Sequence, residues 1–339
     1  MGRLTQSIVN LTRLTSLSTR VLGTGLQGTA LVQRPPSYTI PAFTNLAVGG
    51  YYGGGVNPSQ VDYIDKITFP ADTRTTLSAT LTTAANTYAG GMANSGVAGY
   101  FCGGNDSGGN LSRVDKITFP ADTKTTLSAT LTTARNFLMA MANSGVAGYQ
   151  MGGNDSAPIS GVDKFTFPAD SKTTLSATLS VARYDGAGMA DSGVAGYCCG
   201  GYATGPLSSI DKITFPADTI TTLSATLTSA LRQPGAMANS GVAGYAGGGY
   251  DSVNVSVIDK ITFPADTKTT LSATLTTARY GVVGMANSRV AGYFMGGFDS
   301  ARISATDKIT FPADTKTTIS ATLSVAIRNG AGFADSGVL

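Results

Sequence analysis

The sequence contains no histidine, no tryptophan and no glutamate, so all 20 of its acidic residues are aspartates. Ser-His-Asp and Cys-His catalytic systems and histidine-ligated zinc sites therefore lack their central residue. The three cysteines, Cys102, Cys198 and Cys199, show no CxxC spacing and favour neither a disulfide framework nor a zinc site. We expect a protein that is not an enzyme and holds no cofactor or metal, although a site built on paired aspartates stays open.

Charge and long apolar runs are also scarce. Only 13% of the 339 residues are charged, whereas 42% are hydrophobic. No apolar run approaches the roughly 20 residues that cross a bilayer, and no secretory-type apolar segment opens the chain. We therefore expect a soluble protein without membrane insertion. The 43 glycines, the many threonines and the short apolar runs favour β-strands joined by tight turns.

One sequence unit recurs along the chain. Aligned on the aspartate of "DK", the copies lie 50 residues apart once and 48 residues apart four times, at Asp65, Asp115, Asp163, Asp211, Asp259 and Asp307. Six copies at this period indicate a repeat architecture. Each copy predicts four strands, A to D in chain order, which in residues 136–183 are "NFLMAMAN", "VAGYQMGG", "GVDKFTF" and "LSATLSVAR". Asn-Ser-Gly and "PADSKTT" are expected to form the A–B and C–D turns.

Each repeat places one aspartate among core residues. The alternation in "VDKITF" directs Asp, Ile and Phe to one face of strand C. An arginine stands ahead of strand A in five copies, at Arg135, Arg183, Arg232, Arg279 and Arg328. Because a buried charge needs a partner, we expect each arginine to pair with a strand-C aspartate.

The chain ends predict a closed ring. The repeating part begins at a strand B in residues 44–54 and finishes with an extra strand A in residues 329–337. Four-stranded units of this length are typical of propeller blades, and the last strand would complete the first blade. The predicted fold is an all-β, six-bladed propeller in residues 46–339, preceded by an N-terminal arm in residues 1–45. A linear β-solenoid is the alternative, but it would not need complementary ends.

The repeats resemble kelch repeats, which also run to about 50 residues. The resemblance lies in the arginine ahead of strand A, the "VDK" strand and a glycine doublet that ends strand B. The doublets are Gly54–Gly55, Gly103–Gly104, Gly152–Gly153, Gly200–Gly201, Gly248–Gly249 and Gly296–Gly297. The kelch tryptophan is missing, and the Phe of "TFP" or the Leu of "TTLSATL" is expected to take its packing role.

The copies differ mainly on one side of the predicted disc. Antiparallel strands put the variable D–A and B–C connections on one face and the nearly constant A–B and C–D turns on the other. Seven aromatic residues fall near the variable face: Tyr88, Phe137, Tyr184, Tyr202, Tyr250, Tyr280 and Phe298. Such rings suit sugar stacking or protein contact, so we predict a binding face, with drift in unconstrained loops as the alternative.

The variable B–C loops add polar candidates to this face. They are Asp106, Asp155, Asp251, Asp299 and Arg302. The aspartates could bind polyols or, with carbonyl groups, calcium. Because loops rich in Gly, Ser and Asn use aspartate routinely for turns, no metal is expected.

The first 45 residues do not repeat and contain four arginines but no acidic residue. Several apolar residues in this segment fit helical spacing. We expect an arm that docks on a partner through Arg3, Leu4, Ile8, Leu11, Arg13, Arg20 and Arg34. Four arginines without interleaved aromatic residues argue against nucleic acid as that partner.

Near-identical blades rich in Thr, Ser, Ala and Gly, preceded by a short unrelated segment, resemble virion structural proteins of tailed bacteriophages, particularly cyanophages. The resemblance covers residues 46–339. It implies a tail-fibre or decoration component present in multiple copies per particle. Its arm would contact other virion proteins, and its propeller would meet a host-surface glycan or receptor.

Several alternatives to a virion component stay open. One is a kelch-type or glycan-binding scaffold outside a virion, either extracellular or cytoplasmic. Another is a propeller-fold enzyme, although the chain has no SxDxGxTW box and no copper-binding constellation.

Overall fold

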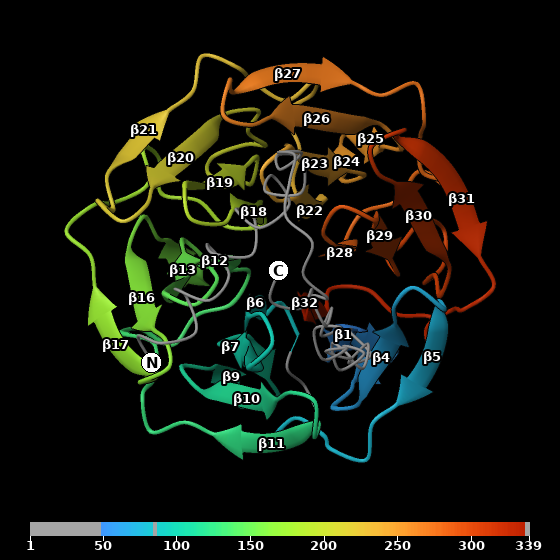
Figure 1. Ribbon diagram of the computed structural model, residues 1–339. Helices are drawn as coiled ribbons and strands as arrows, with labels where there is room; N and C mark the ends of the chain where they lie inside the picture. Colours follow the sequence, from blue (N-terminus) through green and yellow to red (C-terminus); the bar gives the residue numbers. More distant parts are fainter. Residues whose placement is uncertain (1–48, 84–86, 336–339) are drawn as a thin grey trace, which may run out of the picture. The chain divides into compact units, whose positions relative to one another are not determined.

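The protein is a six-bladed β-propeller. The computed structural model describes residues 49–83 and 87–335, which contain no helix and form six four-stranded antiparallel sheets. The chain divides into Met1–Thr44 and Asn45–Leu339, and every sheet belongs to the second unit. The sheets surround a central axis as blades (Figure 1). The predicted all-β propeller is confirmed. Within the described ranges, nothing resembles a membrane-spanning helix.

Each blade runs from an inner strand A to an outer strand D (Figure 1). Blade 1 consists of β32 (Ala331–Asp335), β1 (Gly49–Gly53), β4 (Ile64–Thr68) and β5 (Thr73–Thr76). Blade 2 consists of β6 (Gly90–Asn94), β7 (Ala98–Cys102), β10 (Val114–Thr118) and β11 (Thr123–Thr126). Blade 3 consists of β12 (Met139–Asn143), β13 (Ala147–Met151), β16 (Val162–Thr166) and β17 (Ser171–Thr174).

The second half of the ring repeats this order. Blade 4 consists of β18 (Ala187–Asp191), β19 (Ala195–Cys199), β20 (Ile210–Thr214) and β21 (Ile220–Thr222). Blade 5 consists of β22 (Gly235–Asn239), β23 (Ala243–Gly247), β26 (Ile258–Thr262) and β27 (Thr267–Thr270). Blade 6 consists of β28 (Val283–Asn287), β29 (Ala291–Met295), β30 (Thr306–Thr310) and β31 (Thr315–Ile319).

Four B–C connections form small hairpins of their own. They are β2 (Val56–Asn57) with β3 (Ser59–Gln60), β8 (Asn105–Asp106) with β9 (Gly109–Asn110), β14 (Asn154–Asp155) with β15 (Ala157–Pro158), and β24 (Tyr250–Asp251) with β25 (Val253–Asn254). Blades 4 and 6 have single pairs at the same place, Tyr202 with Pro206 and Phe298 with Arg302.

The C-terminal strand closes the ring, as predicted. β32 pairs with β1 in antiparallel register from Gly49 opposite Asp335 to Gly53 opposite Ala331. Phe333 of β32 is buried against Tyr51 and Phe101, at ring-centroid distances of 5.3 and 4.7 Å. Blade 1 is therefore built from both ends of the repeat region, and β1 has a paired neighbour on each side.

A repeated contact, which we call the clasp, joins each blade to the next. In blade 3, the Tyr149 hydroxyl donates to Asp218 of the following C–D turn at 2.8 Å, and the Lys164 ammonium contacts the other carboxylate oxygen at 2.6 Å. Tyr149 also stacks on Phe215 at 5.0 Å. Tyrosine donates equivalently to all six C–D aspartates, Asp72, Asp122, Asp170, Asp218, Asp266 and Asp314. The clasp explains why the aspartate of "PADTK" is present in all six copies.

The predicted position of strand D was wrong. The outer strand of blade 3 is β17, which lies inside the stretch expected to be a turn. The turn is shorter than expected because Asp170 adopts a left-handed φ of 55° and its N–H donates to the Thr166 carbonyl at 2.9 Å. "LSATLSVAR" then leaves the sheet, since Leu175 and Leu179 pack in the apolar layer between blades 3 and 4.

Three of the five predicted arginine–aspartate pairs form. Asp163, Asp211 and Asp307 pair with Arg135, Arg183 and Arg279 respectively. The prediction was wrong for Arg232 and Arg328, because buried Leu231 and Ile327 occupy the equivalent position one residue earlier. The aspartate does not depend on arginine. In blade 5, Asp259 accepts hydrogen bonds from the N–H and hydroxyl of Thr228 and from the Thr270 hydroxyl.

Candidate functional site

The propeller has two faces of different character. We call the side of the A–B and C–D turns the turn face, and the side of the D–A and B–C connections the loop face. On the loop face, bridging pairs join a D–A residue to a B–C residue in every blade: Val56–Arg328, Thr87–Asn105, Asn136–Asn154, Tyr184–Tyr202, Arg232–Tyr250 and Tyr280–Phe298. The two kinds of variable connection therefore lie on one face, as predicted, and these backbone pairs also hold them together.

The glycine doublets position the D–A connections. Both glycines of each doublet have positive φ, for example 63° at Gly103 and 98° at Gly104, where a side chain would be strained. The N–H of Gly104 donates to the Arg135 carbonyl in the connection to the next blade at 2.9 Å. Equivalent bonds from Gly153, Gly201, Gly249 and Gly297 repeat this contact. Each doublet thus ends strand B, and its second glycine holds the D–A connection that leads to the next blade.

A closed circle of six backbone hydrogen bonds surrounds the axis on the loop face. In order, its members are Tyr88, Phe137, Asp185, Gln233, Gly281 and Asn329. The N–H of each member donates to the carbonyl of the member before it, and Tyr88 donates to Asn329, with N···O distances from 2.5 to 3.2 Å. We call this circle the hub ring. It ties together the starts of all six inner strands.

The hub ring combines one backbone conformation with six different residue types. All its members have φ between 54° and 65°, a region in which glycine and asparagine are favoured and bulky residues are strained. The circle uses only backbone atoms, and Gly281 takes part in it without a side chain. The side chains of Tyr88, Phe137, Asp185 and Gln233 are therefore not required by the ring itself.

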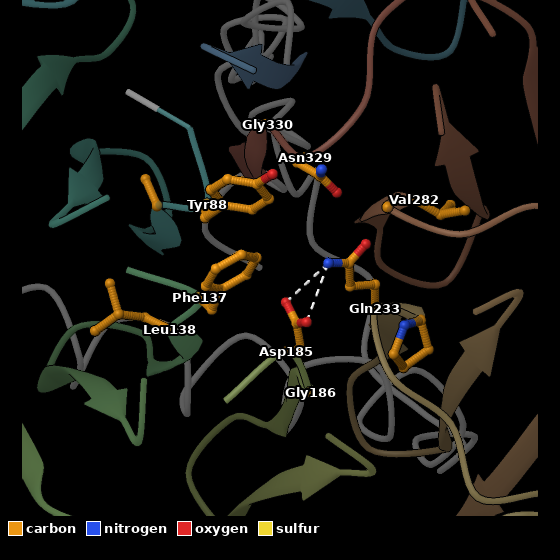
Figure 2. Close-up of a pocket in the computed structure, with 12 residues that line it drawn as sticks. Tyr88, Phe137, Leu138, Asp185, Gly186, Gln233, Val282, Asn329 and Gly330 are labelled. Carbon is orange, nitrogen blue, oxygen red and sulfur yellow. Dashed lines mark hydrogen bonds between the residues drawn. The ribbon is translucent and has the colours of Figure 1, made fainter. Parts of the chain in front are cut away.

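These side chains surround a small cavity of about 70 Å³ on the axis. Figure 2 shows Tyr88 and Phe137 on one side, Gln233 on the other, and Asp185 and Asn329 between them. The next residue of each connection completes the lining, and all six are apolar: Ala89, Leu138, Gly186, Pro234, Val282 and Gly330. The cavity is therefore lined by one set of aromatic and polar residues and a second set of apolar ones.

Asp185 is the unusual charged group of this cavity. It is 5% exposed, and among the described residues its carboxylate accepts hydrogen bonds only from the Gln233 amide, at 3.1 and 3.0 Å. Burial raises the pKa of Asp185 to about 7, whereas the Gln233 hydrogen bond and Arg232 act in the opposite direction. Among the described residues, no cation lies within ion-pair distance of it. The Gln233 carbonyl oxygen is also buried, and it has no hydrogen-bond partner in residues 49–83 and 87–335.

The seven predicted aromatic residues form a continuous arc on the loop face. Each is partly exposed. Ring contacts join Tyr88 to Phe137, Phe137 to Tyr184, Tyr184 to Tyr202, Tyr250 to Tyr280, and Tyr280 to Phe298, with centroids 3.8 to 5.8 Å apart. Arg232 bridges Tyr202 and Tyr250, at 5.7 and 4.8 Å from the ring centroids. Arg328 lies 4.6 Å from the Phe298 centroid. We call these nine residues the aromatic arc.

The predicted polar residues lie on the same face but do not gather into one site. Asp106 accepts a hydrogen bond from the Gly108 N–H, which is a turn contact, and Asp155 is exposed. Asp299 accepts a hydrogen bond from the Asn254 side chain at 2.9 Å, while the Asp251 carbonyl accepts one from the Ser252 hydroxyl.

No three acidic or cysteine side chains cluster in metal-binding geometry in the described part of the chain. Arg302 pairs through its backbone with Phe298, which places it beside the aromatic arc. The expected anchoring residues, Arg3 to Arg34, lie outside the described residues.

The sequence interpretation missed Asp185, Gln233, Asn329 and the bridging arginines. Aligning the copies on the arginine ahead of strand A shifted Arg232 and Arg328 by one residue. Alignment on the 48-residue spacing alone would have placed Asp185, Gln233, Gly281 and Asn329 in one column. That column contains a different residue in each copy, which is the signal that could have identified the hub ring.

Comparisons with known proteins assign the chain to no family. No protein-family model matches the chain, and no curated protein matches it. The class that the fold defines is therefore the β-propeller.

Proposed function

We propose that the protein is a non-enzymatic binding module whose loop face contacts a host-surface glycan or protein receptor. The aromatic arc is the observation that carries this proposal, since every blade contributes at least one of its members. Partly exposed aromatic rings offer flat apolar surfaces to sugars and peptides, and interleaved arginines add donors for hydroxyl or carboxylate groups.

We also propose that the protein is a virion component, a tail-fibre or decoration protein with kelch-like blades, present in multiple copies. The support is the sequence resemblance of residues 46–339 and the basic, acid-free segment that precedes them. In this proposal residues 1–45 bind other virion proteins and the loop face is presented to the host.

The binding face can be tested with Tyr184→Ala and Tyr280→Ala combined in the full-length protein. Both rings belong to the aromatic arc and are partly exposed. We expect binding to a glycan array or to host cells to weaken by about tenfold or more, because one stacked ring contributes on the order of 1 kcal/mol. The melting temperature should change little.

The matched control replaces two exposed turn-face residues, Val146→Ala and Val194→Ala, which are 47% and 45% exposed. This variant should bind like the parent protein. Equal binding by the tyrosine variant and the control would rule out the aromatic arc as the contact surface.

The virion assignment needs a separate experiment. Deleting residues 1–45 should leave a folded propeller that is missing from purified particles, as judged by mass spectrometry of the particles. If the truncated chain is still incorporated, the anchoring role is wrong.

A further inference from the structure

We propose that the hub-ring cavity binds a primary ammonium group, held by the Asp185 carboxylate and the Gln233 carbonyl oxygen against the rings of Tyr88 and Phe137. This site lies at the centre of the loop face, but it requires neither the virion assignment nor ligand binding by the rest of the aromatic arc. Figure 2 shows the four side chains around one space.

The first argument is the unbalanced charge of Asp185. The strand-C aspartates are also buried, but each accepts several hydrogen bonds, as Asp163 does from the Thr132 N–H, the Thr132 hydroxyl and the Thr174 hydroxyl. Within the part of the chain that the structure describes, Asp185 has only one donor, the Gln233 amide. A buried carboxylate with so little compensation must either take up a proton or acquire a cation.

The neighbouring acceptor points to a ligand that donates hydrogen bonds. The Gln233 amide nitrogen donates to Asp185, while its carbonyl oxygen is buried and finds no partner among the residues that the structure describes. An unsatisfied buried acceptor costs about 1–3 kcal/mol. An ammonium group has three donors and no acceptor, so it can contact both the carboxylate and this oxygen.

The cavity walls favour an organic cation over a metal ion. Calcium requires six to eight oxygen ligands, whereas this cavity offers one carboxylate. Ala89, Leu138, Pro234 and Val282 line it, together with two aromatic rings whose centroids are 3.8 Å apart. Aromatic faces attract ammonium ions, most strongly where water is excluded. A volume of about 70 Å³ admits a small head group such as methylammonium.

The charged groups near Asp185 do not supply the cation that its carboxylate needs. Arg232 influences Asp185 electrostatically, but its guanidinium lies between the rings of Tyr202 and Tyr250. Tyr88 and Tyr184 also face Asp185, and burial raises the pKa of both phenols, so they remain neutral near pH 7. Asp185 is therefore the anionic group available to a ligand in the cavity.

The test is calorimetric titration of the full-length protein with methylammonium chloride, against sodium chloride at equal ionic strength. Saturable binding is expected at pH 8. Affinity should fall severalfold at pH 6, because the pKa of Asp185 is about 7 and the protonated carboxyl has no charge to offer. Glucosamine and N-acetylglucosamine form a second pair of probes, and only the former carries an amine. Binding of glucosamine as well as methylammonium would identify amino sugars as a source of the group.

The matched variants are Asp185→Asn and Asp299→Asn, which remove the same charge from two places on the loop face. Asp185→Asn should weaken methylammonium binding by about tenfold or more, whereas Asp299→Asn should bind like the parent. No saturable binding by the parent protein, equal affinity in both variants, or saturation by calcium in place of methylammonium would each overturn the assignment. If Asp185→Asn does not fold, the pH dependence of the parent protein is the test. A methylammonium affinity that does not change between pH 6 and pH 8 would overturn the proposed site.

Discussion

The turn face and the loop face show how one repeated backbone can serve two purposes. On the turn face the same side chains recur, and the clasp joins tyrosine, lysine and aspartate around the whole ring, including from blade 6 to Asp72 of blade 1. The serines of neighbouring A–B turns are linked as well, since the Ser144 N–H donates to the Ser192 hydroxyl and the Ser192 N–H to the Ser240 hydroxyl. On the loop face, the hub ring keeps the same geometry with six different residues.

The difference lies in which atoms make the contacts between blades. Turn-face contacts use side chains, so a substitution there removes a bond between blades. Hub-ring contacts use backbone atoms, so its side chains can change without opening the circle. The loop face is therefore free to diversify because the turn face and the backbone hold the disc together.

The largest effect is expected from truncation after Arg328, which removes β32 and one member of the hub ring. It exposes the edge of β1 and the apolar surfaces that Phe333 covers. We expect a loss of more than about 5 kcal/mol in the free energy of unfolding, enough to abolish cooperative folding. Chemical denaturation followed by circular dichroism measures this.

A chain truncated after Asp335 retains all of β32 and is the control for the previous experiment. It should unfold like the full-length protein. A cooperative transition at the same midpoint in both truncated chains would show that closure by β32 does not hold the ring together.

A smaller effect on the free energy of unfolding is expected when one aspartate on each face is replaced by asparagine. Asp218→Asn retains a residue that tolerates the left-handed φ of 56° but weakens the clasp with Tyr149 and Lys164. We expect a loss of about 1–2 kcal/mol, whereas Asp299→Asn on the loop face should stay within about 0.5 kcal/mol. Similar losses in urea denaturation would contradict the division of roles between the faces.

The fold was predictable because its signals are periodic. The 48-residue spacing of the strand-C aspartates and the complementary strands at the two ends determine blade number and closure. The position of strand D was not predictable from composition, because "PADSKTT" contains both a turn and a strand. The boundary between them follows Asp170, which the structure shows held in the clasp.

The candidate site was predictable only in part. The aromatic arc could be found because aromatic residues recur in corresponding loops. The 48-residue spacing puts Asp185 and Gln233 in one column of the repeat, but the sequence does not show that this column closes into a backbone circle in which the two side chains meet. The arginines were misleading, because Leu231 and Ile327 replace two of the buried guanidinium groups that the pattern led us to expect.

The smallest effect concerns the stability of the loop face as pH changes. The pKa of Asp185 is raised from 3.8 to about 7 by burial, so the folded state holds this proton more tightly than the unfolded chain does. The resulting stabilisation is complete below about pH 4 and is lost as pH rises through about 7. Asp185→Asn has no carboxyl group at this position and therefore does not lose this stabilisation. The difference between the melting temperatures of Asp185→Asn and the parent should therefore shift by about 2–4 °C in favour of the variant between pH 5 and pH 8.

Asp299→Asn is the control for this measurement, because its carboxylate lies on the same face and already has a donor in Asn254. It should follow the pH dependence of the parent protein. Parallel curves for the parent and both variants, measured by calorimetry without added amine, would mean that Asp185 titrates as it does in the unfolded chain.

Adding methylammonium at pH 8 tests whether the ionised Asp185 carboxylate also binds a cation. A rise in the melting temperature of the parent that is missing from Asp185→Asn would show that a cation replaces the proton in the hub-ring cavity.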